Sequence, residues 1–331
     1  MPYNFKLINA GYPAAINDAN FEEIALALFN YQYDNNDLYR QFVQALKIEP
    51  RTVTAIEKIP FLPISFFRTH KIVTGEHTGT PLLFESSGTT GEATSRHYVY
   101  DVRLYEEAML NGFREFYGTP SDYAIIGLLP SYLERKTSSL VHMANLLMEK
   151  SGHPENGFYL DEFAKLYEVL RKLEAVKQPA ILLGVTFALL DFAEAYPMPL
   201  NTTIVMETGG MKGRRTEWTR TQVHEYLCAQ WGLKQVHAEY GMTELLSQAY
   251  SKKDGLFKCI PSMQVLVRDM NDPLDVDVKG TGCLNIIDLA NVHSCAFVAT
   301  DDIGTIHDNG AFEVLGRADY SALRGCNLMV I

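Results

Sequence analysis

Apolar residues recur at helical spacing near the start of the chain. Between residues 19 and 48, apolar positions such as Ile24, Leu28, Phe42 and Val43 are separated by polar ones. Asn35-Asn36-Asp37 interrupts this pattern, so we expect two helices. The two prolines in Ile59-Pro60-Phe61-Leu62-Pro63-Ile64 forbid a regular helix and favour an extended segment.

From residue 120 onward, short apolar runs alternate with amphipathic segments. The runs predict strands at residues 124–129, 180–183, 203–206 and 235–238. The amphipathic segments predict helices at residues 138–150, 161–172, 187–195 and 216–231. Short apolar strands that alternate with helices imply a mostly parallel sheet with helices on both faces. The expected fold class is therefore α/β.

The pattern changes after residue 255, where helical periodicity stops. Apolar runs predict strands at residues 265–267, 284–287, 296–298 and 312–315, joined by turns that contain Gly, Asp and Asn. This part is expected to be a smaller antiparallel β region. We therefore divide the chain into an α/β core over residues 1–255 and a β-rich nucleotide-site subdomain over residues 256–331.

Composition and charge narrow the class of protein. Of the 331 residues, 47% are hydrophobic and 21% are charged, as in a globular protein. The formal net charge of -11 repels phosphate backbones, so nucleic acid is not expected as a partner. The sequence shows no apolar run that would span a bilayer and no signal-peptide layout at its start. The five cysteines are odd in number and lack C-x-x-C spacing, which favours a reduced, cytoplasmic protein.

The loops after the expected strands are the first candidates for chemistry. Ligands of open parallel sheets bind beyond the carboxyl ends of the strands. The loops at that edge are residues 184–186, 207–215 and 239–244, and the last two are rich in glycine and charge. Tight turns and solvated charges would explain one such loop. Two that converge at one sheet edge indicate a ligand site.

A third candidate is the segment 85–95, which follows the apolar Leu82-Leu83-Phe84. Its hydroxyls and glycines offer many donors, and glycine lets the backbone wrap closely around an anion such as a phosphate chain. No Gly-Lys-Ser/Thr closes the segment, so it is not a Walker A loop. The G-x-G-x-x-G spacing of a dinucleotide fingerprint is also absent. A kinase or a dehydrogenase is therefore disfavoured.

Five motifs resemble those of the adenylate-forming superfamily, which includes acyl-CoA synthetases, luciferase and peptide-synthetase adenylation domains. They are Ser86-Ser87-Gly88-Thr89-Thr90-Gly91, Thr208-Gly209-Gly210, Tyr240-Gly241-Met242-Thr243-Glu244, Thr300-Asp301-Asp302-Ile303-Gly304 and Gly316-Arg317-Ala318-Asp319. Each motif alone is a weak signal, but five in the superfamily's order are a strong one. The resemblance extends over nearly the whole chain and implies ATP and Mg²⁺ as cofactors.

The resemblance also implies roles for individual residues. Tyr240 is expected to stack on adenine, Thr243 to contact the α-phosphate and Glu244 to hold magnesium. Asp302 is expected to bind both ribose hydroxyls, and Arg317 to reach the nucleotide. The nucleotide-binding residues implied in this way are Ser86, Ser87, Gly88, Thr89, Thr90, Gly91, Thr94, Thr208, Gly209, Gly210, Glu239, Tyr240, Gly241, Met242, Thr243, Asp302 and Arg317.

Within the superfamily, residues 60–67 and 207–215 look most like the acyl-protein synthetase group, which supplies fatty acyl groups to a reductase in bacterial luminescence. Most superfamily members continue into a mobile lid domain with a catalytic lysine. This chain stops at Ile331, so we expect that lid to be absent and Lys212 to replace part of the lysine's role. The group places an acyl-accepting cysteine near the C-terminus, and Cys326 matches it. The expected catalytic residues are Cys326, Lys212, Thr243 and Arg317.

The expected function is ATP-dependent activation of a carboxylic acid, with a fatty acid as the first candidate, to an acyl-adenylate. Transfer of the acyl group to a protein thiol follows, with an acyl reductase or an acyl-carrier protein as the expected partner. Two alternatives stay open. One is a carboxylate–CoA or acyl-carrier-protein ligase with a shortened lid, and the other is a non-catalytic protein that binds a nucleotide or an acyl-adenylate.

Overall fold

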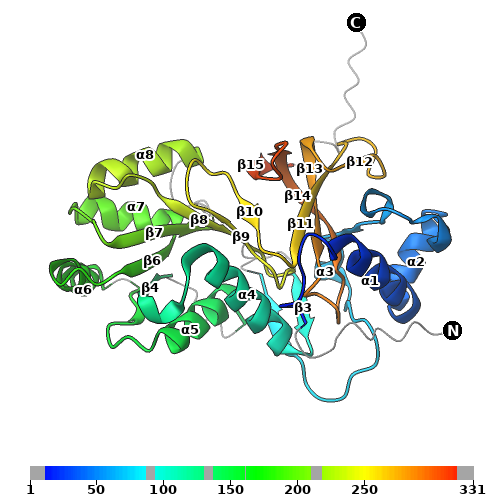
Figure 1. Ribbon diagram of the computed structural model, residues 1–331, viewed down its shortest axis with the longest axis horizontal. Helices are drawn as coiled ribbons and strands as arrows, with labels where there is room; N and C mark the ends of the chain where they lie inside the picture. Colours follow the sequence, from blue (N-terminus) through cyan, green and yellow to red (C-terminus); the bar gives the residue numbers. More distant parts are fainter. Residues whose placement is uncertain (1–11, 87–93, 130–136, 161, 210–217, 319–331) are drawn as a thin grey trace, which may run out of the picture.

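Two large β-sheets lie next to each other, each with its own helices (Figure 1). The computed structural model describes residues 12–86, 94–129, 137–160, 162–209 and 218–318. In the described part of the chain, none of the helices is long and apolar enough to cross a membrane.

The first sheet has seven strands in the order β10-β9-β8-β7-β6-β4-β5. Strands β5, β4, β6, β7 and β8 pair in parallel, whereas β9 and β10 continue the sheet antiparallel. Their bounds are Ala124–Leu128 (β4), Gly157–Phe158 (β5), Ala180–Val185 (β6), Thr203–Thr208 (β7), His237–Tyr240 (β8), Ala249–Ser251 (β9) and Lys258–Cys259 (β10). The mostly parallel sheet predicted from the sequence is therefore present, with an antiparallel edge.

The second sheet has six strands and is antiparallel except where β1 pairs in parallel with β14. Its strands are Leu62–Pro63 (β1), Met263–Arg268 (β11), Val276–Asp277 (β12), Gly280–Asp288 (β13), Phe297–Ile306 (β14) and Phe312–Arg317 (β15). A separate hairpin joins Leu82–Glu85 (β2) to Arg96–Val99 (β3). The expectation of a smaller antiparallel β region after residue 255 is confirmed.

Capping residues mark the ends of several helices. Their bounds are Phe21–Asn35 (α1), Asp37–Ala45 (α2), Phe66–Thr69 (α3), Val102–Tyr117 (α4), Ser139–Ser151 (α5), Phe163–Ala175 (α6), Thr186–Ala195 (α7) and Arg220–Trp231 (α8), with short 3₁₀ turns at Pro50–Thr52 (η1), Ile56–Lys58 (η2) and Pro120–Asp122 (η3). A capping box of Thr219 and Gln222 starts α8, and Gly232 in the left-handed region ends it. At the start of α5, the Ser138 hydroxyl accepts a hydrogen bond from the Val141 N–H.

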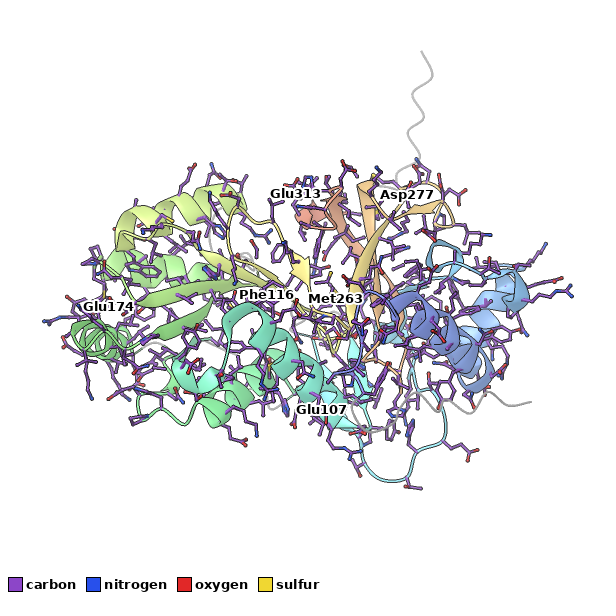
Figure 2. The ribbon with its side chains drawn as sticks, viewed as in Figure 1. Glu107, Phe116, Glu174, Met263, Asp277 and Glu313 are labelled. Carbon is purple, nitrogen blue, oxygen red and sulfur yellow. The ribbon has the colours of Figure 1, made fainter. Side chains whose placement is uncertain are left out.

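Helices cover both faces of the first sheet. Every residue of β4 and β6 is buried, as expected of central strands in a parallel sheet. α7 and α8 lie on one face, and α4 and α5 lie on the other (Figure 1). The carboxylate of Glu174 in α6 accepts bonds from the backbone N–H groups of Asn201 and Thr203 at 2.8 and 3.0 Å, which fixes the start of β7. Figure 2 shows Glu174 at the outer end of this half, whereas Phe116 and Met263 lie near the middle of the molecule.

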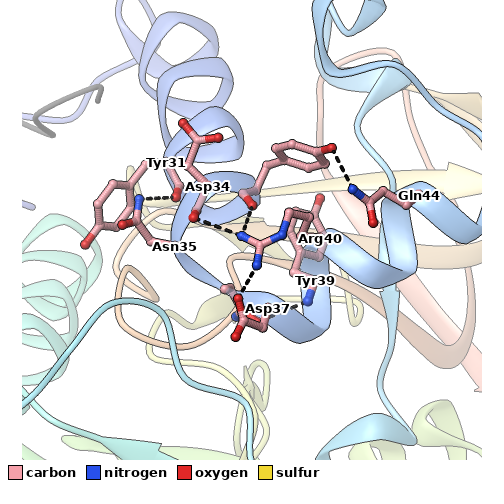
Figure 3. A network of polar contacts seen from close by, with 9 residues as sticks. Tyr31, Asp34, Asn35, Asp37, Tyr39, Arg40 and Gln44 are labelled. Carbon is pink, nitrogen blue, oxygen red and sulfur yellow. Dashed lines mark hydrogen bonds and ion pairs between the residues drawn. The ribbon is translucent and has the colours of Figure 1, made fainter. Parts of the chain in front are cut away.

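Polar contacts at the α1–α2 junction explain why two helices form instead of one. Asn36 has an extended backbone between them, and its side-chain oxygen accepts from the Tyr39 N–H at 3.0 Å. Arg40 donates to the carbonyl oxygen of Asp34 at 3.0 Å and pairs with Asp37. Figure 3 shows these contacts around the guanidinium group. The interruption predicted at residues 35–37 is confirmed.

The N-terminal helices pack on the second sheet, whose strands come mostly from the C-terminal part of the chain. Gln32 is fully buried, and its side chain bonds to the backbone of Asn291, Val292 and Ala296. Asn36 donates to the carbonyl oxygen of Ser294 at 3.1 Å. Residue 255 itself lies between β9 and β10, which pair within the first sheet. The division of the chain at residue 255 stays a prediction, and in space the segment before β2 lies with the strands that follow residue 260.

Most expected elements are confirmed, with boundaries shifted by a few residues. The hydrophobic pattern did not indicate the helices α3 and α4, the hairpin β2–β3 or the short strands β5, β9, β10 and β12. α4 is the longest of these elements and has a buried face that includes Leu104, Met109 and Phe113. It lies before residue 120, ahead of the segment in which the sequence predicted alternating strands and helices.

Replacing Gln32 with leucine should destabilise the protein strongly. A leucine side chain would fit the volume but would leave the Ala296 N–H and two buried carbonyl oxygens without partners, at a cost of about 2–4 kcal/mol. Urea denaturation measures the free energy of unfolding. The matched control is Gln44→Leu, since Gln44 is exposed, and it should change stability by less than about 0.5 kcal/mol. Equal losses in the two variants would contradict the role of Gln32.

Candidate functional site

The segments predicted as ligand loops do meet at one edge of the first sheet, but the first of them is not a loop, because residues 184–186 are the end of β6 and the first residue of α7. Strands β6, β7 and β8 are neighbours and parallel, so the segments after Val185, Thr208 and Tyr240 leave the sheet side by side. The Thr186 hydroxyl lies 2.7 Å from the carbonyl oxygen of Gly209, so the start of α7 contacts the segment after β7 directly. Gly209 has φ +73°, which a side chain would strain. The sheet rule applied to the sequence therefore located these loops correctly.

The hairpin β2–β3 brings together the two ends of the predicted phosphate loop. The Ser86 N–H donates to the Ser95 carbonyl oxygen at 3.1 Å, and the Ser95 N–H donates to Ser86 Oγ at 2.9 Å. Ser86 and Thr94 thus lie at the two ends of the predicted phosphate loop. The residues between them, which include the candidates Ser87, Gly88, Thr89, Thr90 and Gly91, lie outside the described residues.

Tyr240 and Asp302 join the first sheet to the second. The Tyr240 hydroxyl donates to Asp302 Oδ2 at 2.8 Å, and Arg317 Nε donates to Asp302 Oδ1 at 3.0 Å. Asp302 is 5% exposed, whereas the Arg317 side chain is 78% exposed, so this ion pair contributes little stability. The ring of Tyr240 packs against Phe257 and Phe312. Three predicted site residues are thus brought together, while their contacts with adenine and ribose stay predictions.

Glu244 is a buried acid at the end of the Tyr240–Glu244 motif. Burial raises the pKa of its carboxyl, although a hydrogen bond with Ser95 and the charges of Arg317 and Arg68 act in the opposite direction. Mg²⁺ is commonly held by one or two carboxylates together with substrate phosphates, so a single carboxylate close to the phosphate-loop hairpin fits that ion. No cluster of three or more His, Cys, Asp or Glu side chains suited to a metal occurs among the described residues.

Two further acids, Glu207 and Glu239, lie on the neighbouring strands β7 and β8, but their pKa values are shifted in opposite directions. Glu207, on β7, faces Thr186, Arg220 and His224; burial raises its pKa, but these three partners outweigh burial and lower it overall. Glu239, on β8, accepts from the Thr208 hydroxyl at its Oε2 at 2.6 Å, and the described part of the chain shows no basic partner for it. Burial, together with the charge of Glu207, raises the pKa of Glu239 to about 7.

The carboxyl group of Glu239 lies close to Gly241, where any other residue would place a Cβ atom. A Cβ atom at Gly241 would lie 2.4 Å from Glu239 Oε1, so the carboxyl group packs beneath the start of the next loop. Because Thr208 and Glu239 are paired residues of β7 and β8, their bond ties the two loops together at their bases. Glu239 therefore supports the loops that the sequence assigned to the nucleotide.

Asp288 fixes the segment that follows Glu244. It is fully buried at the end of β13, and its carboxylate accepts from the N–H groups of Leu246 and Ser247 at 2.6 and 3.1 Å and from the Ser247 hydroxyl at 2.6 Å. Burial raises the pKa of Asp288, and these hydrogen bonds counteract it. Asp288, His97 and Asn291 are residues of this site that the sequence did not indicate, because each acts on a segment distant in the chain.

Several candidates from the sequence fall where no structure is described. Gly210 and Lys212 belong to residues 207–215, named below as the glycine loop, and both lie outside the described residues. Cys326, near the C-terminus, also lies outside them. Met242 and Thr243 are half-buried in the loop after β8. The roles expected for all of these residues stay predictions.

Comparison with known proteins supplies an independent line of evidence. Residues 14–125 match the model of the family described as acyl-protein synthetase, LuxE. A 70-residue stretch is 31% identical to a long-chain-fatty-acid–luciferin-component ligase of Photorhabdus luminescens, covering 21% of this chain and 60% of that protein. The resemblance to the acyl-protein synthetase family is confirmed. The family match contains the whole β2–β3 hairpin and α4.

Solved structures extend the similarity over most of the fold. A 2-hydroxyisobutyryl-CoA ligase with 2-HIB-AMP and CoA superposes with a TM-score of 0.66 at 14% identity, covering 91% of this chain and 69% of that chain. O-succinylbenzoate CoA synthetase from Bacillus subtilis, in complex with ATP and magnesium ion, gives a TM-score of 0.50 at 16% identity and covers 74% and 53%. The fold is the α/β fold of the N-terminal part of adenylate-forming ligases, with mixed sheets. The chain spans about half to two-thirds of the length of these relatives.

The raised pKa of Glu239 predicts a pH-dependent stability. The folded protein binds this proton more tightly than the unfolded chain, so its contribution is present below about pH 4.5 and is lost as the pH rises through about 7. Glu239→Gln mimics the protonated form. The free energy of unfolding of this variant, relative to that of the wild type, should rise by on the order of 3 kcal/mol from pH 5 to pH 8. Urea denaturation at each pH measures it. Glu313→Gln, an acid on β15, is the control, and a wild-type pH slope in Glu239→Gln would contradict the prediction.

Proposed function

We propose that this protein activates a carboxylic acid with ATP to form an acyl-adenylate, with a fatty acid as the first candidate substrate. The observation that carries the proposal is the convergence of the end of β7, the Tyr240–Glu244 segment and Asp302 around one sheet edge, next to the β2–β3 hairpin, whose His97 contacts Thr243. The family match and the fold similarity to adenylate-forming ligases support the same reaction.

The chemistry requires positioning more than acid–base catalysis. A substrate carboxylate is already ionised at neutral pH and attacks the α-phosphorus of ATP without a general base, releasing pyrophosphate. The barrier is lowered by holding the reactants in line and by stabilising the charge on the phosphates. In this proposal Ser86, Thr94 and Thr243 donate to phosphate oxygens, and Asp302 binds the ribose. Mg²⁺, held by Glu244, would neutralise phosphate charge when bound.

Two cations are proposed to act on the phosphates. Arg317 is exposed and anchored at its Nε by Asp302, so the rest of its guanidinium group can turn toward a ligand. Lys212 belongs to the glycine loop in the sequence, and we propose that it stabilises charge in the adenylation step. In a pyrophosphate-exchange assay, a near-normal rate in Lys212→Ala would remove Lys212 from this role.

The second step of the proposal transfers the acyl group from AMP to a thiol. A thiolate attacks the acyl carbon of the adenylate, the bond to the phosphate oxygen breaks, and AMP leaves as a thioester forms. Cys326 is the proposed acceptor on this chain, and an acyl reductase or an acyl-carrier protein is the proposed partner. Among the described cysteines, burial raises the pKa of Cys259 and of Cys295 to about 12, which makes both poor nucleophiles.

A carboxylate–CoA ligase is the second candidate function, and the similarity to CoA ligases supports it at the level of the fold. CoA-dependent release of AMP would favour it over a protein acceptor. A third candidate is a protein that binds a nucleotide or acyl-adenylate without turnover. Pyrophosphate exchange separates this candidate from both enzymes, because a binding protein gives none.

Pyrophosphate exchange with a panel of fatty, aromatic and short-chain acids should identify an acid that supports adenylation. With that acid, Glu244→Gln should lower the exchange rate by about 10²-fold or more, because the metal would lose its carboxylate. Glu313→Gln, on the outer strand β15, is the matched control and should keep the wild-type rate. Exchange that is absent with every acid would contradict the proposed function, and full activity in Glu244→Gln would contradict its metal.

The acceptor is tested by labelling. After incubation with ATP and the radiolabelled acid, the wild-type chain should carry a label that hydroxylamine removes, since hydroxylamine cleaves thioesters. Cys326→Ser should abolish this label without lowering pyrophosphate exchange. Cys228→Ser, at a half-buried cysteine in α8, is the control and should retain the label. Label that persists in Cys326→Ser would rule out this acceptor.

A further inference from the structure

His97 and Asn291 lie between the phosphate-loop hairpin and the loop that follows β8. His97, in β3, is 1% exposed, and its Nδ1 lies 2.9 Å from the carbonyl oxygen of Thr243. Its Nε2 lies 3.1 Å from Oδ1 of Asn291. The Nδ2 of Asn291 in turn donates to the carbonyl oxygen of Glu244 at 3.0 Å. The side chains of His97 and Asn291, which contact each other, therefore reach the carbonyl oxygens of the consecutive residues Thr243 and Glu244, in the segment that follows β8.

This pair is buried and anchored from other parts of the fold. Asn291 is 1% exposed, and its own carbonyl oxygen accepts from Gln32 of α1 at 3.0 Å. The ring of Phe67 packs edge-on against the ring of His97, with 5.7 Å between their centres. A buried carbonyl that loses its partner carries a free-energy penalty, so the two carbonyls hold the loop to these side chains.

The protonation state of His97 is consistent with one firm bond to the loop. Burial lowers its pKa to about 4, although the bonds to Thr243 and Asn291 act in the opposite direction. The ring is therefore neutral at neutral pH and has a single N–H. Because a carbonyl oxygen can only accept, the tautomer that keeps the bond to Thr243 carries its proton on Nδ1.

We propose that His97 and Asn291 are positioning residues that set the distance between the phosphate-loop hairpin and Glu244. They are named below as the His97–Asn291 clamp. The proposal rests on the proposed function, because that function assigns the hairpin and Glu244 to the phosphates and magnesium of ATP.

The clamp contacts the backbone of Thr243 and Glu244, so the side chains of these two residues stay available for a ligand. The carbonyls of Thr243 and Glu244 bond to the clamp, and the N–H groups of Leu246 and Ser247 bond to Asp288. The loop is thus held through its backbone on both sides. Since His97 belongs to β3, the clamp links the β2–β3 hairpin to the backbone of Thr243 and Glu244. A shift of about 1 Å between groups that bind one ligand is enough to weaken binding and slow the reaction.

Four variants separate the clamp from simple packing. His97→Phe keeps a ring but removes the hydrogen bond to Thr243, and Asn291→Leu removes the bond to Glu244. His97→Asn retains an amide N–H near the position of Nδ1 and is the conservative rescue. Phe67→Leu is the matched control, because it loosens packing on His97 and leaves the hydrogen bonds of the clamp intact. Thermal denaturation of each variant confirms that it folds.

The first readout is steady-state pyrophosphate exchange. His97→Phe and Asn291→Leu should raise KM for Mg·ATP about tenfold, the equivalent of roughly one hydrogen bond, with a smaller change in kcat. His97→Asn should stay within about threefold of the wild type, and Phe67→Leu should keep the wild-type KM. An unchanged KM in His97→Phe, or an equal increase in Phe67→Leu, would overturn the proposal.

The second readout does not depend on adenylation. Amide hydrogen exchange at residues 245–247 should speed up in His97→Phe and Asn291→Leu but not in Phe67→Leu, and nitrogen NMR of the wild type should show the Nδ1–H tautomer of His97. Unchanged exchange, or the Nε2–H tautomer, would overturn the clamp. If the wild type gives no pyrophosphate exchange with any acid while these two results hold, the proposed function fails and the clamp stands.

Discussion

The buried carboxylate of Asp288 is the interaction on which the arrangement of the candidate site depends. It belongs to β13 of the second sheet, but its partners lie in the loop that follows β8 of the first sheet. A buried charge is tolerated only when several donors surround it, and here the N–H groups of Leu246, Ser247 and Ala290 and the Ser247 hydroxyl do so. Without Asp288 the N–H groups of Leu246 and Ser247 would lose this partner. The position of the Tyr240–Glu244 motif against the second sheet, and with it the bond from Tyr240 to Asp302, follows from this contact.

Buried acids of one chemical type differ in charge because their partners differ. Glu207 has two basic side chains nearby and its pKa is lowered, whereas Glu239, one strand away, has the Thr208 hydroxyl as its partner among the described residues, and burial raises its pKa to about 7. The chain carries a formal net charge of -11, and ATP is itself an anion. A carboxyl with a raised pKa carries less negative charge at neutral pH than an ordinary one, which reduces the negative charge that an incoming nucleotide meets at the sheet edge. The same burial that raises the pKa of Glu239 therefore also suits the proposed ligand.

Sequence similarity and fold similarity cover different extents of the chain, for a physical reason. The family match ends in β4, whereas the fold similarity to a CoA ligase at 14% identity extends over 91% of the chain. A sheet needs apolar side chains of suitable size in its core, and many residues meet that need.

The sequence alone determined the local elements and the edge of the sheet at which the motif loops meet. Helical spacing placed α1, α2 and α5 to α8, and the parallel-sheet rule brought together the loops after β7 and β8, because both depend on the order of residues along a short segment. It did not determine that Gln32 would pack on residues 291–296, or that His97 would bond to Thr243, because these contacts join segments far apart in the chain. Nor did it determine the pKa of Glu239, since a carboxyl group keeps its ordinary pKa until tertiary packing removes the water around it. Tertiary structure thus decided the partners and charge states of the site, while the sequence decided which residues were available for them.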